Sequence, residues 1–484
     1  MNRRNVIWVL GIGTGVMLLA QPPSLAAGLF GGHDDPIAPV ILGVTGILFF
    51  AILGRFAARR LNQPSVLGEV LIGIVIGVFG SYLGLELIIV LREGPAVFDV
   101  INLALSGQSL DSAAREILGE PAADELLSVL QGPNGGVYMG VAHTVDVFSR
   151  YGVIFLLFLV GLKSSVEEMR TVGFEAGRVA ILGVVVPFVL GFASMRLLAP
   201  EVSINTDMFV AATLGATSVG ITAEVLRELG RDSSREGYII IGAAVIDDIL
   251  GLIMLAIVSG IIVSGGVDIA NVLTIIFLAT AFLAGAVYLG PYLLRATVKV
   301  LGQLDIVEAK MFTSFMFVMV LAWLANFVGL ATIVGAFTAG IILHEGYFKN
   351  LGPQNRSVSI RELISPLEVI LVPIFFILMG IQVKLESFLE FNVILTAGGL
   401  LMAAVLGKVI SGWGAGSGAN RWLIGFGMMP RGEVGLIFAS IGKSLGVITD
   451  ALFSAVVLMI IVTTLIAPPL IKLATRLDGA SVAQ

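Results

Sequence analysis

Long apolar segments recur along this chain from residue 38 to residue 474, and they restrict its possible folds more than any other feature. The hydrocarbon core of a bilayer is about 30 Å thick, so a helix needs roughly 20 apolar residues to cross it. The sequence provides such segments repeatedly, with 57% hydrophobic and only 13% charged residues. We therefore predict an all-α polytopic membrane protein.

Hydropathy predicts about thirteen crossing segments. They are expected near residues 38–59, 66–90, 150–166, 176–198, 207–228, 237–263, 271–295, 311–328, 330–345, 366–383, 391–413, 422–444 and 450–474. If the mature N-terminus lies outside, most of the 28 basic residues fall in cytoplasmic loops. This asymmetry satisfies the positive-inside rule, and it predicts a cytoplasmic C-terminus.

The N-terminal residues 1–27 are predicted to be a signal peptide, because Arg3 and Arg4 precede an apolar run and a stretch of small residues. An additional N-terminal helix is the alternative. Residues 28–484 are expected to form one membrane domain with an extracytoplasmic insertion at residues 92–147. Within the insertion, Ser109 to Leu130 should form one or two short amphipathic helices.

Several kinds of chemistry are excluded by composition. The chain has no cysteine, which excludes disulfides, thiolate metal sites and cysteine nucleophiles. Its three histidines, His33, His143 and His344, are expected in or beside loops, so no imidazole cluster lies in the membrane. The net charge of −6 comes without a basic stripe, which argues against a nucleic-acid partner. We expect no enzyme activity and no cofactor, because the intramembrane acids lack a paired nucleophile or a metal-ligand cluster.

Two adjacent carboxylates, Asp247 and Asp248, lie near the middle of an otherwise apolar segment. A charge at the bilayer centre costs at least about 2.5 kcal/mol on insertion scales, so such residues mark pathways or sites. Neighbouring helical residues point about 100° apart, which predicts different roles for the two aspartates. Carboxylate oxygens suit hard cations such as Na+, and a desolvated carboxylate beside another has a raised proton affinity. H+ and a metal cation can therefore compete here, although a purely structural buried pair is the alternative.

Lys408 lies inside another predicted crossing segment, antiparallel to the aspartate segment and at a compatible depth. We expect one of the two aspartates to be its partner. A lysine left alone in a dry site has a lowered pKa, so cation entry could make Lys408 release a proton. The alternative is that the side chain of Lys408 reaches the cytoplasmic interface about a turn away.

Two segments contain helix-breaking residues in mid-membrane, at residues 216–222 and 425–435. Interrupted helices in the two halves of a transporter are typical of inverted repeats, so we predict two such repeats with two discontinuous crossing helices. The hydroxyl groups of the first segment are candidate cation ligands: Thr217, Ser218 and Thr222. In the second segment, Arg431 and Glu433 would compensate half-helix dipoles, the base near a C-terminal end and the acid near an N-terminal end.

At these residues the chain resembles bacterial sodium/proton antiporters of the monovalent cation:proton antiporter-2 branch of the cation:proton antiporter superfamily. The similarity spans most of the membrane part of the chain. Its motifs are Gln63 to Gly73, Thr217 to Thr222, the aspartate pair, Gly335 to Gly340, Lys408 and Pro430 to Gly435.

The resemblance implies a homodimer in which each subunit has a dimerisation domain and a six-helix core that moves like an elevator. The core would contain the fourth to sixth and eleventh to thirteenth segments. It further implies that Asp248 holds the transported Na+, that Asp247 pairs with Lys408, and that exchange is electrogenic.

The function predicted from the sequence is exchange of Na+ or Li+ for H+ across a bacterial inner membrane or another energy-coupling membrane. The expected partners are monovalent cations, protons, the bilayer and a second copy of the chain. A K+/H+ antiporter is the nearest alternative, and a cation channel or ion sensor is a remote one. A channel would need a pore lined by carbonyls or rings of charge, and the sequence contains no such loop.

Overall fold

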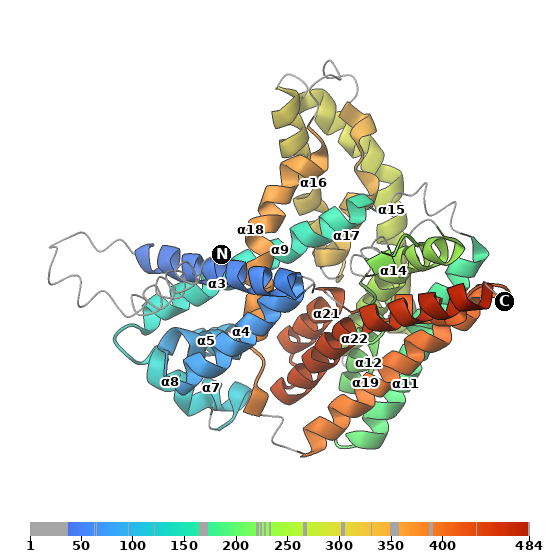
Figure 1. Ribbon diagram of the computed structural model, residues 1–484. Helices are drawn as coiled ribbons and strands as arrows, with labels where there is room; N and C mark the ends of the chain where they lie inside the picture. The colour runs from blue at the N-terminus through green and yellow to red at the C-terminus, as the bar shows by residue number, and fades with distance from the viewer. Residues whose placement is uncertain are drawn as a thin grey trace, which may run out of the picture. The chain divides into compact units, whose positions relative to one another are not determined.

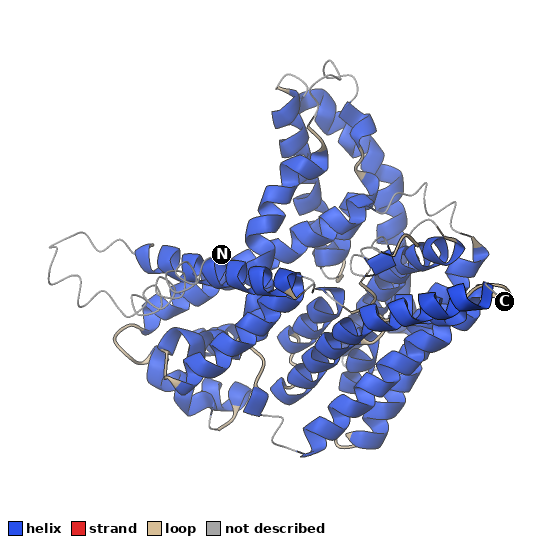
Figure 2. Ribbon diagram, viewed as in Figure 1, coloured by secondary structure: helices blue, strands red, loops and turns tan. Residues whose placement is uncertain are grey.

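The computed structural model describes residues 37–482, apart from residues 62, 64, 95, 121, 164–172, 219–221, 223–224, 227–228, 232–233, 265–268, 302–304, 331, 349–357, 387–390 and 432. For some positions inside helices, among them Asp248 and Glu433, only the backbone is described. All regular secondary structure in the described residues is helical (Figure 2). The predicted signal peptide, residues 1–27, lies outside the described residues.

The chain divides into two compact units, residues 1–152 with 370–385 and residues 153–369 with 386–484. The first unit contains α3 (Ala38–Arg60), α4 (Ser65–Tyr82), α5 (Glu86–Glu93), α6 (Ala96–Leu105), α7 (Leu110–Leu118), α8 (Ala122–Leu130), the first part of α9 (Gly135–Lys163) and the last part of α18 (Ile360–Ile381) (Figure 1).

Close packing of α3 against α4 organises the first unit. A Cβ on Gly54 would lie 2.4 Å from the carbonyl oxygen of Gly68, so the two backbones touch where neither residue has a side chain. One residue further along each helix, Arg55 forms an ion pair with the fully buried Glu69. A glycine contact and an ion pair therefore hold the two helices at one point.

The predicted crossing segment 66–90 is wrong at its C-terminal end. Helix α4 ends at Tyr82, the chain turns at Gly84 with a φ of 67°, and the separate helix α5 begins at Glu86. Glycine accepts a positive φ without a steric penalty, so Gly84 allows the turn. Hydropathy missed this break because apolar residues continue on both sides of the turn.

Residues 92–147, the predicted insertion, contain the two short helices that the sequence predicts, α7 and α8. They share a small apolar core with α6, made by Val100, Ala113, Ala114, Ala123 and Leu127. Helix α9 begins at Gly135, well before the predicted crossing segment at residue 150, and it places His143 inside a helix rather than beside a loop. His143 and Asp146, in its third and fourth turns, interrupt the apolar pattern and separate this start from the segment that hydropathy identified.

The second unit contains the remaining parts of α9 and α18. Its other elements are α11 (Phe174–Leu198), α12 (Ile204–Thr213), α14 (Arg235–Ser264), α15 (Ile269–Leu301), α16 (Ile306–Phe327), α17 (Thr332–Ile342), η1 (Glu345–Phe348), α19 (Phe391–Ser411), η4 (Gly412–Ala415), α20 (Arg421–Gly427), α21 (Glu433–Ser444) and α22 (Asp450–Val482).

Within this unit, α11 packs against α12, α14 and α19, while α19 packs against α20 and α22. Figure 1 shows α11 and α19 side by side along much of their length. Among the described residues, nine helices of the chain are long and apolar enough to cross a membrane. The prediction of an all-α polytopic membrane protein is confirmed.

Candidate functional site

Two chain breaks meet inside the second unit. Helix α12 ends at Thr213 and leaves residues 214–218 non-helical, while α20 ends at Gly427 and α21 begins at Glu433. The backbone N–H of Ser218 in the first break donates to the carbonyl of Pro430 in the second, at 2.8 Å. The two helix-breaking segments singled out from the sequence are therefore in direct contact.

Side chains satisfy the carbonyl groups that the two helix ends leave without partners. The last carbonyls of an α-helix have no N–H partner within the helix. In the first break, the carbonyl of Leu214 accepts from Arg431 and that of Gly215 accepts from Lys408. In the second break, the carbonyls of Gly427 and Met428 accept from threonine hydroxyls. The carbonyl groups at both breaks therefore have hydrogen-bond donors, as buried backbone groups require.

Thr217 lies in the first break and Thr222 follows that break in the sequence, and both bind the second break. Thr222 donates to the carbonyl of Gly427 at 2.6 Å, and Thr217 donates to that of Met428 at 3.2 Å. The hydroxyl of Thr217 also lies within hydrogen-bonding reach of the Asp247 carboxylate. A hydroxyl has one proton and two lone pairs, so Thr217 can exchange partners between the carboxylate and the carbonyl.

Asp247 and Lys408 form a fully buried ion pair between α14 and α19. The Nζ of Lys408 lies 3.2 Å from both Oδ1 and Oδ2 of Asp247, and both side chains are 0% exposed. The burial of Lys408 contradicts the alternative in which it reaches the membrane interface. Such a pair needs good geometry and further hydrogen bonds to compensate its desolvation, and the carbonyl of Gly215 and the hydroxyl of Thr217 provide them.

Arg431 is a second fully buried cation beside this pair. Its guanidinium donates to the carbonyl of Leu214 at the C-terminal end of α12, and it approaches the carbonyl of Ala404 in α19 at 3.5 Å. Its own carbonyl accepts from Thr464 in α22. Arg431 therefore lies where a positive charge complements a helix C-terminus, and it contacts three helices of the unit.

Gly183 forms the wall of the site on the side of α11. A Cβ on this residue would lie 3.5 Å from Oδ1 of Asp247, 3.5 Å from Nζ of Lys408 and 3.7 Å from Cε of Met428. The backbone of α11 therefore borders the ion pair directly. A side chain larger than methyl would occupy the space beside the two charged groups.

The structure brings together six of the eight predicted site residues: Thr217, Ser218, Thr222, Asp247, Lys408 and Arg431. For Asp248 and Glu433 the structure describes only the backbone. Asp248 follows Asp247 in α14, and Glu433 is the first residue of α21. Sequence reasoning missed Gly183, and the carbonyls of residues 214, 215, 427 and 428 as acceptors. A glycine within an apolar helix gives no signal that separates it from ordinary helix packing.

The site contains charged groups and oxygen ligands that are buried away from solvent. In the part of the chain that the structure describes, no group of three or more His, Cys, Asp or Glu side chains could hold a metal ion. The available oxygens are instead a carboxylate, hydroxyls and backbone carbonyls, which suit a weakly held hard cation. Any cation at Asp247 would compete with the ammonium of Lys408.

Comparison with known proteins identifies the family. The sequence profile described as sodium/hydrogen exchanger, transmembrane, matches residues 46–476. The chain belongs to the sodium/hydrogen exchanger family. This membership confirms the family resemblance and the prediction that the chain is a secondary transporter rather than an enzyme.

Two relatives and one solved structure illustrate where this sodium/hydrogen exchanger stands. It is 36% identical over 446 residues to the high-affinity Na(+)/H(+) antiporter NhaS3 of Synechocystis, with 90% of each chain covered. It is 31% identical to the Na(+)/H(+)-K(+) antiporter GerN of Bacillus cereus, covering 88% of this chain and 94% of the relative. Its fold is similar to that of the sodium proton antiporter MjNhaP1 from Methanocaldococcus jannaschii, with a TM-score of 0.57 at 16% identity, covering 91% of this chain and 99% of that one.

Proposed function

We propose that this exchanger moves Na+, or Li+, in one direction and H+ in the other, at the site formed around Asp247 and Asp248. The observation that carries the proposal is the fully buried ion pair of Asp247 with Lys408, located where two interrupted helices meet. The Synechocystis relative, a high-affinity Na(+)/H(+) antiporter at 36% identity, supports Na+ as the cation. Monovalent cations and protons are then the transported species, and no resident cofactor takes part.

A charge balance assigns roles to the two aspartates. Lys408 and Arg431 are both fully buried, and Asp247 interacts electrostatically with both. One carboxylate cannot neutralise two cations, and an uncompensated buried charge is costly. We propose that Asp248, the next residue of α14, balances the second charge when no transported cation is bound. We assign the transported ion to Asp248, and Thr217, Ser218 and Thr222 to its oxygen surroundings.

The contacts of Lys408 suggest how cation entry is coupled to proton release. The ammonium binds the Asp247 carboxylate and the Gly215 carbonyl at the same time. When Na+ binds at Asp248 and repels the ammonium, the Asp247 carboxylate and the Gly215 carbonyl become available together to complete the coordination of the ion. A lysine that loses its carboxylate in a dry site has a lower proton affinity, so it releases H+ as Na+ binds. H+ and Na+ then exclude each other, which is the requirement for antiport.

Finer features of the architecture belong to the same proposal. The interrupted helix α12 lies in the fifth predicted segment and the α20–α21 break in the twelfth, the middle segments of the two predicted core triplets. This correspondence supports two inverted repeats within a thirteen-segment topology. We propose that the six core segments move as an elevator against a dimerisation domain in a homodimer, and that Glu433 compensates the N-terminal end of α21.

The membrane and the orientation are proposed from the distribution of charge. The bacterial relatives support an inner or other energy-coupling membrane. From the distribution of basic residues we propose that the mature N-terminus lies outside and the C-terminus in the cytoplasm, and that residues 1–27 are a cleaved signal peptide.

K+ exchange is the second candidate, and the Bacillus cereus relative, a Na(+)/H(+)-K(+) antiporter, favours it. Backbone and hydroxyl oxygens bind either ion, so the contacts around Asp247 are compatible with both. Family membership favours an exchanger over a cation channel or an ion sensor.

Proton flux in proteoliposomes tests the proposal. A pH-sensitive dye inside vesicles reports dissipation of an imposed pH gradient on addition of NaCl, LiCl or KCl. Na+ and Li+ should collapse the gradient in the wild type, and Asp248→Asn and Lys408→Ala should be inactive or strongly impaired. Glu125→Gln, which neutralises an exposed carboxylate in the insertion, is the matched control and should behave like the wild type.

Two further measurements in the same proteoliposomes distinguish the alternatives. If exchange is electrogenic, clamping the membrane potential should change the initial rate of proton flux. The rate of an electroneutral exchanger would stay the same. A response to KCl equal to that with NaCl would favour the K+ alternative. Full activity of Asp248→Asn would show that the assigned carboxylate does not hold the ion.

A further inference from the structure

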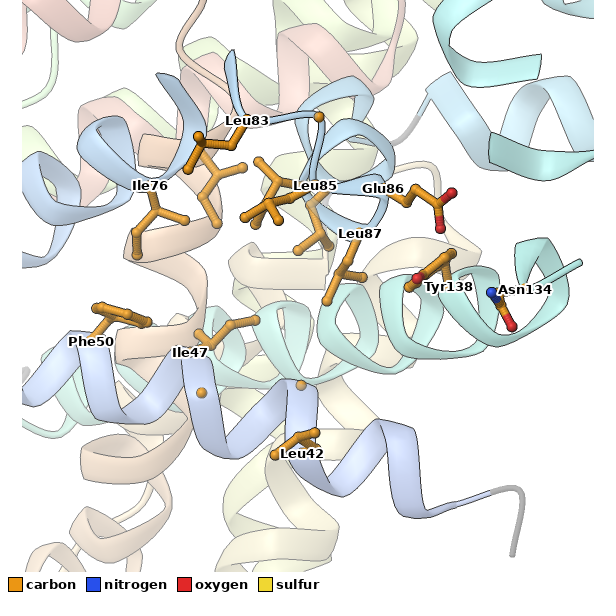
Figure 3. A pocket seen from close by; sticks show the side chains of 16 residues that line it. Leu42, Ile47, Phe50, Ile76, Leu83, Leu85, Glu86, Leu87, Asn134 and Tyr138 are labelled. Carbon is orange, nitrogen blue, oxygen red and sulfur yellow. The ribbon is translucent and has the colours of Figure 1, made fainter. Parts of the chain in front are cut away.

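A cavity of about 340 Å³ lies within the first unit, remote in sequence from the residues of the ion site. Figure 3 shows the side chains that line it. They come from α3, the end of α4 and the turn that follows it, α5, the start of α9 with the preceding Asn134, and Ile381 of α18. The cavity far exceeds the roughly 30 Å³ that one water molecule takes in the liquid.

The lining of the cavity is apolar over most of its area and polar in one part. Most of it is aliphatic or aromatic, including Leu42, Ile47, Phe50 and Ile76 (Figure 3). The polar lining side chains are Glu86, Asn134 and Tyr138, which Figure 3 shows gathered together. This is an amphipathic pocket, with a large apolar part and a small polar group of side chains.

The polar group combines a carboxylate with neutral hydrogen-bonding partners. Glu86 is the first residue of α5 and is exposed, and the hydroxyl of Tyr138 lies within hydrogen-bonding reach of its carboxylate. Asn134 supplies an amide oxygen, which accepts hydrogen bonds as a carboxylate does. A primary ammonium has three donors and no acceptor, so these groups complement it in both charge and hydrogen bonding.

The segments that line the pocket are all predicted to lie on the same side of the membrane. The start of α3, the end of α4 and the start of α9 all belong to the outer side in the orientation predicted from the basic residues. Tyrosine is enriched at membrane interfaces, where its ring is apolar and its hydroxyl contacts water. The polar group is therefore expected at headgroup level and the apolar part at the depth of the acyl chains.

We propose that this pocket binds an outer-leaflet phospholipid with a primary ammonium headgroup, of the phosphatidylethanolamine kind. One acyl chain fills the apolar part, and the ammonium contacts Glu86 and Asn134. Lipid tails are as apolar as the pocket wall, so transfer of a tail from the bilayer gives little net driving force. Selectivity therefore comes from the headgroup, and Glu86 disfavours anionic lipids that lack an ammonium.

Native mass spectrometry of the purified full chain tests the proposal with chain-matched phosphatidylethanolamine and phosphatidylglycerol. The wild type should retain phosphatidylethanolamine preferentially, by a factor on the order of three, the range expected for one partly solvated ion pair. Glu86→Gln keeps the size of the side chain and removes its charge, so it should reduce the preference to parity. Glu125→Gln, an exposed carboxylate of the same unit outside the pocket lining, should leave the preference unchanged.

A second variant examines the apolar part independently. Leu42→Trp replaces a lining leucine with a larger, aromatic side chain and should reduce retention of both lipids by a similar factor. Thermal unfolding of each variant, compared with the wild type without added lipid, identifies any loss of folding. Equal retention of the two lipids by the wild type, or a preference that survives Glu86→Gln in a folded protein, would overturn the proposal. Neither outcome would affect the ion-exchange assay, which concerns residues of the other unit.

Discussion

Gly407 touches Pro187 as closely as a residue without a side chain allows: a Cβ on Gly407 would lie 2.7 Å from the Cα of Pro187. Pro187 lies inside α11 and Gly407 immediately precedes Lys408 in α19. Because the two helices meet at this point, the depth and direction of Lys408 depend on the contact. The position of the buried ammonium thus depends on a glycine that has no chemistry of its own.

Replacing Gly407 with alanine should therefore impair both stability and exchange. The added methyl group must displace backbone atoms of α11, and overpacking of this kind costs about 1–3 kcal/mol. We expect a lower thermal unfolding midpoint in detergent and a reduced exchange rate. Gly398→Ala in the same helix is the control, because a Cβ there meets nothing within 4 Å. Equal behaviour of the two variants would contradict the packing argument.

The buried pair should show strong coupling in a double-mutant cycle. Lys408→Met leaves the Asp247 carboxylate buried without its cation, and Asp247→Asn leaves the ammonium without its anion. Removing one partner of such a pair costs about 3–5 kcal/mol, whereas replacing both by neutral groups is often close to neutral. Each single variant should unfold at a lower temperature than the Asp247→Asn/Lys408→Met double variant. Additive losses of stability would indicate that the two side chains do not interact.

Gly183 should influence cation binding through the space that it leaves beside the pair. A methyl group at 3.5 Å from the charged atoms makes ordinary contacts, so Gly183→Ala should retain exchange. Gly183→Val places additional atoms against Asp247 and Lys408 and should raise the apparent KM for Na+ by about tenfold, which corresponds to about 1.4 kcal/mol. The size-matched control is Gly177→Val, on the same helix where a Cβ meets nothing within 4 Å. An unchanged KM in a folded Gly183→Val protein would show that the ion does not bind beside α11.

Competition between H+ and Na+ predicts a specific pH dependence. If both ions use the same carboxylates, lowering the pH should raise the apparent KM for Na+ while the maximal rate at saturating Na+ changes less. The measurement is a series of Na+ titrations in proteoliposomes at several pH values. A KM that stays constant while the maximal rate falls would instead indicate separate sites for the two ions.

Many features of this protein could be predicted from local sequence. Hydropathy identified the membrane class, and the glycine-rich segments predicted where α12 ends and where α20 and α21 separate. Predictions failed where the local signal was ambiguous. The turn at Gly84 is hidden within an apolar run, and the start of α9 is separated from the predicted segment by polar residues in its third and fourth turns.

The sequence by itself determined which residues could not face lipid, because a charge or a helix break in an apolar segment is costly regardless of the fold. It could not determine their partners. Asp247 and Lys408 are 161 positions apart, and Thr222 and Gly427 are 205 positions apart. Only the tertiary structure decided that Lys408 binds Asp247 and Gly215, that Thr217 and Thr222 satisfy carbonyls of the second break, and that Gly183 borders the pair. These relations depend on how helices pack in three dimensions, and the spacing of residues along the chain does not record that packing.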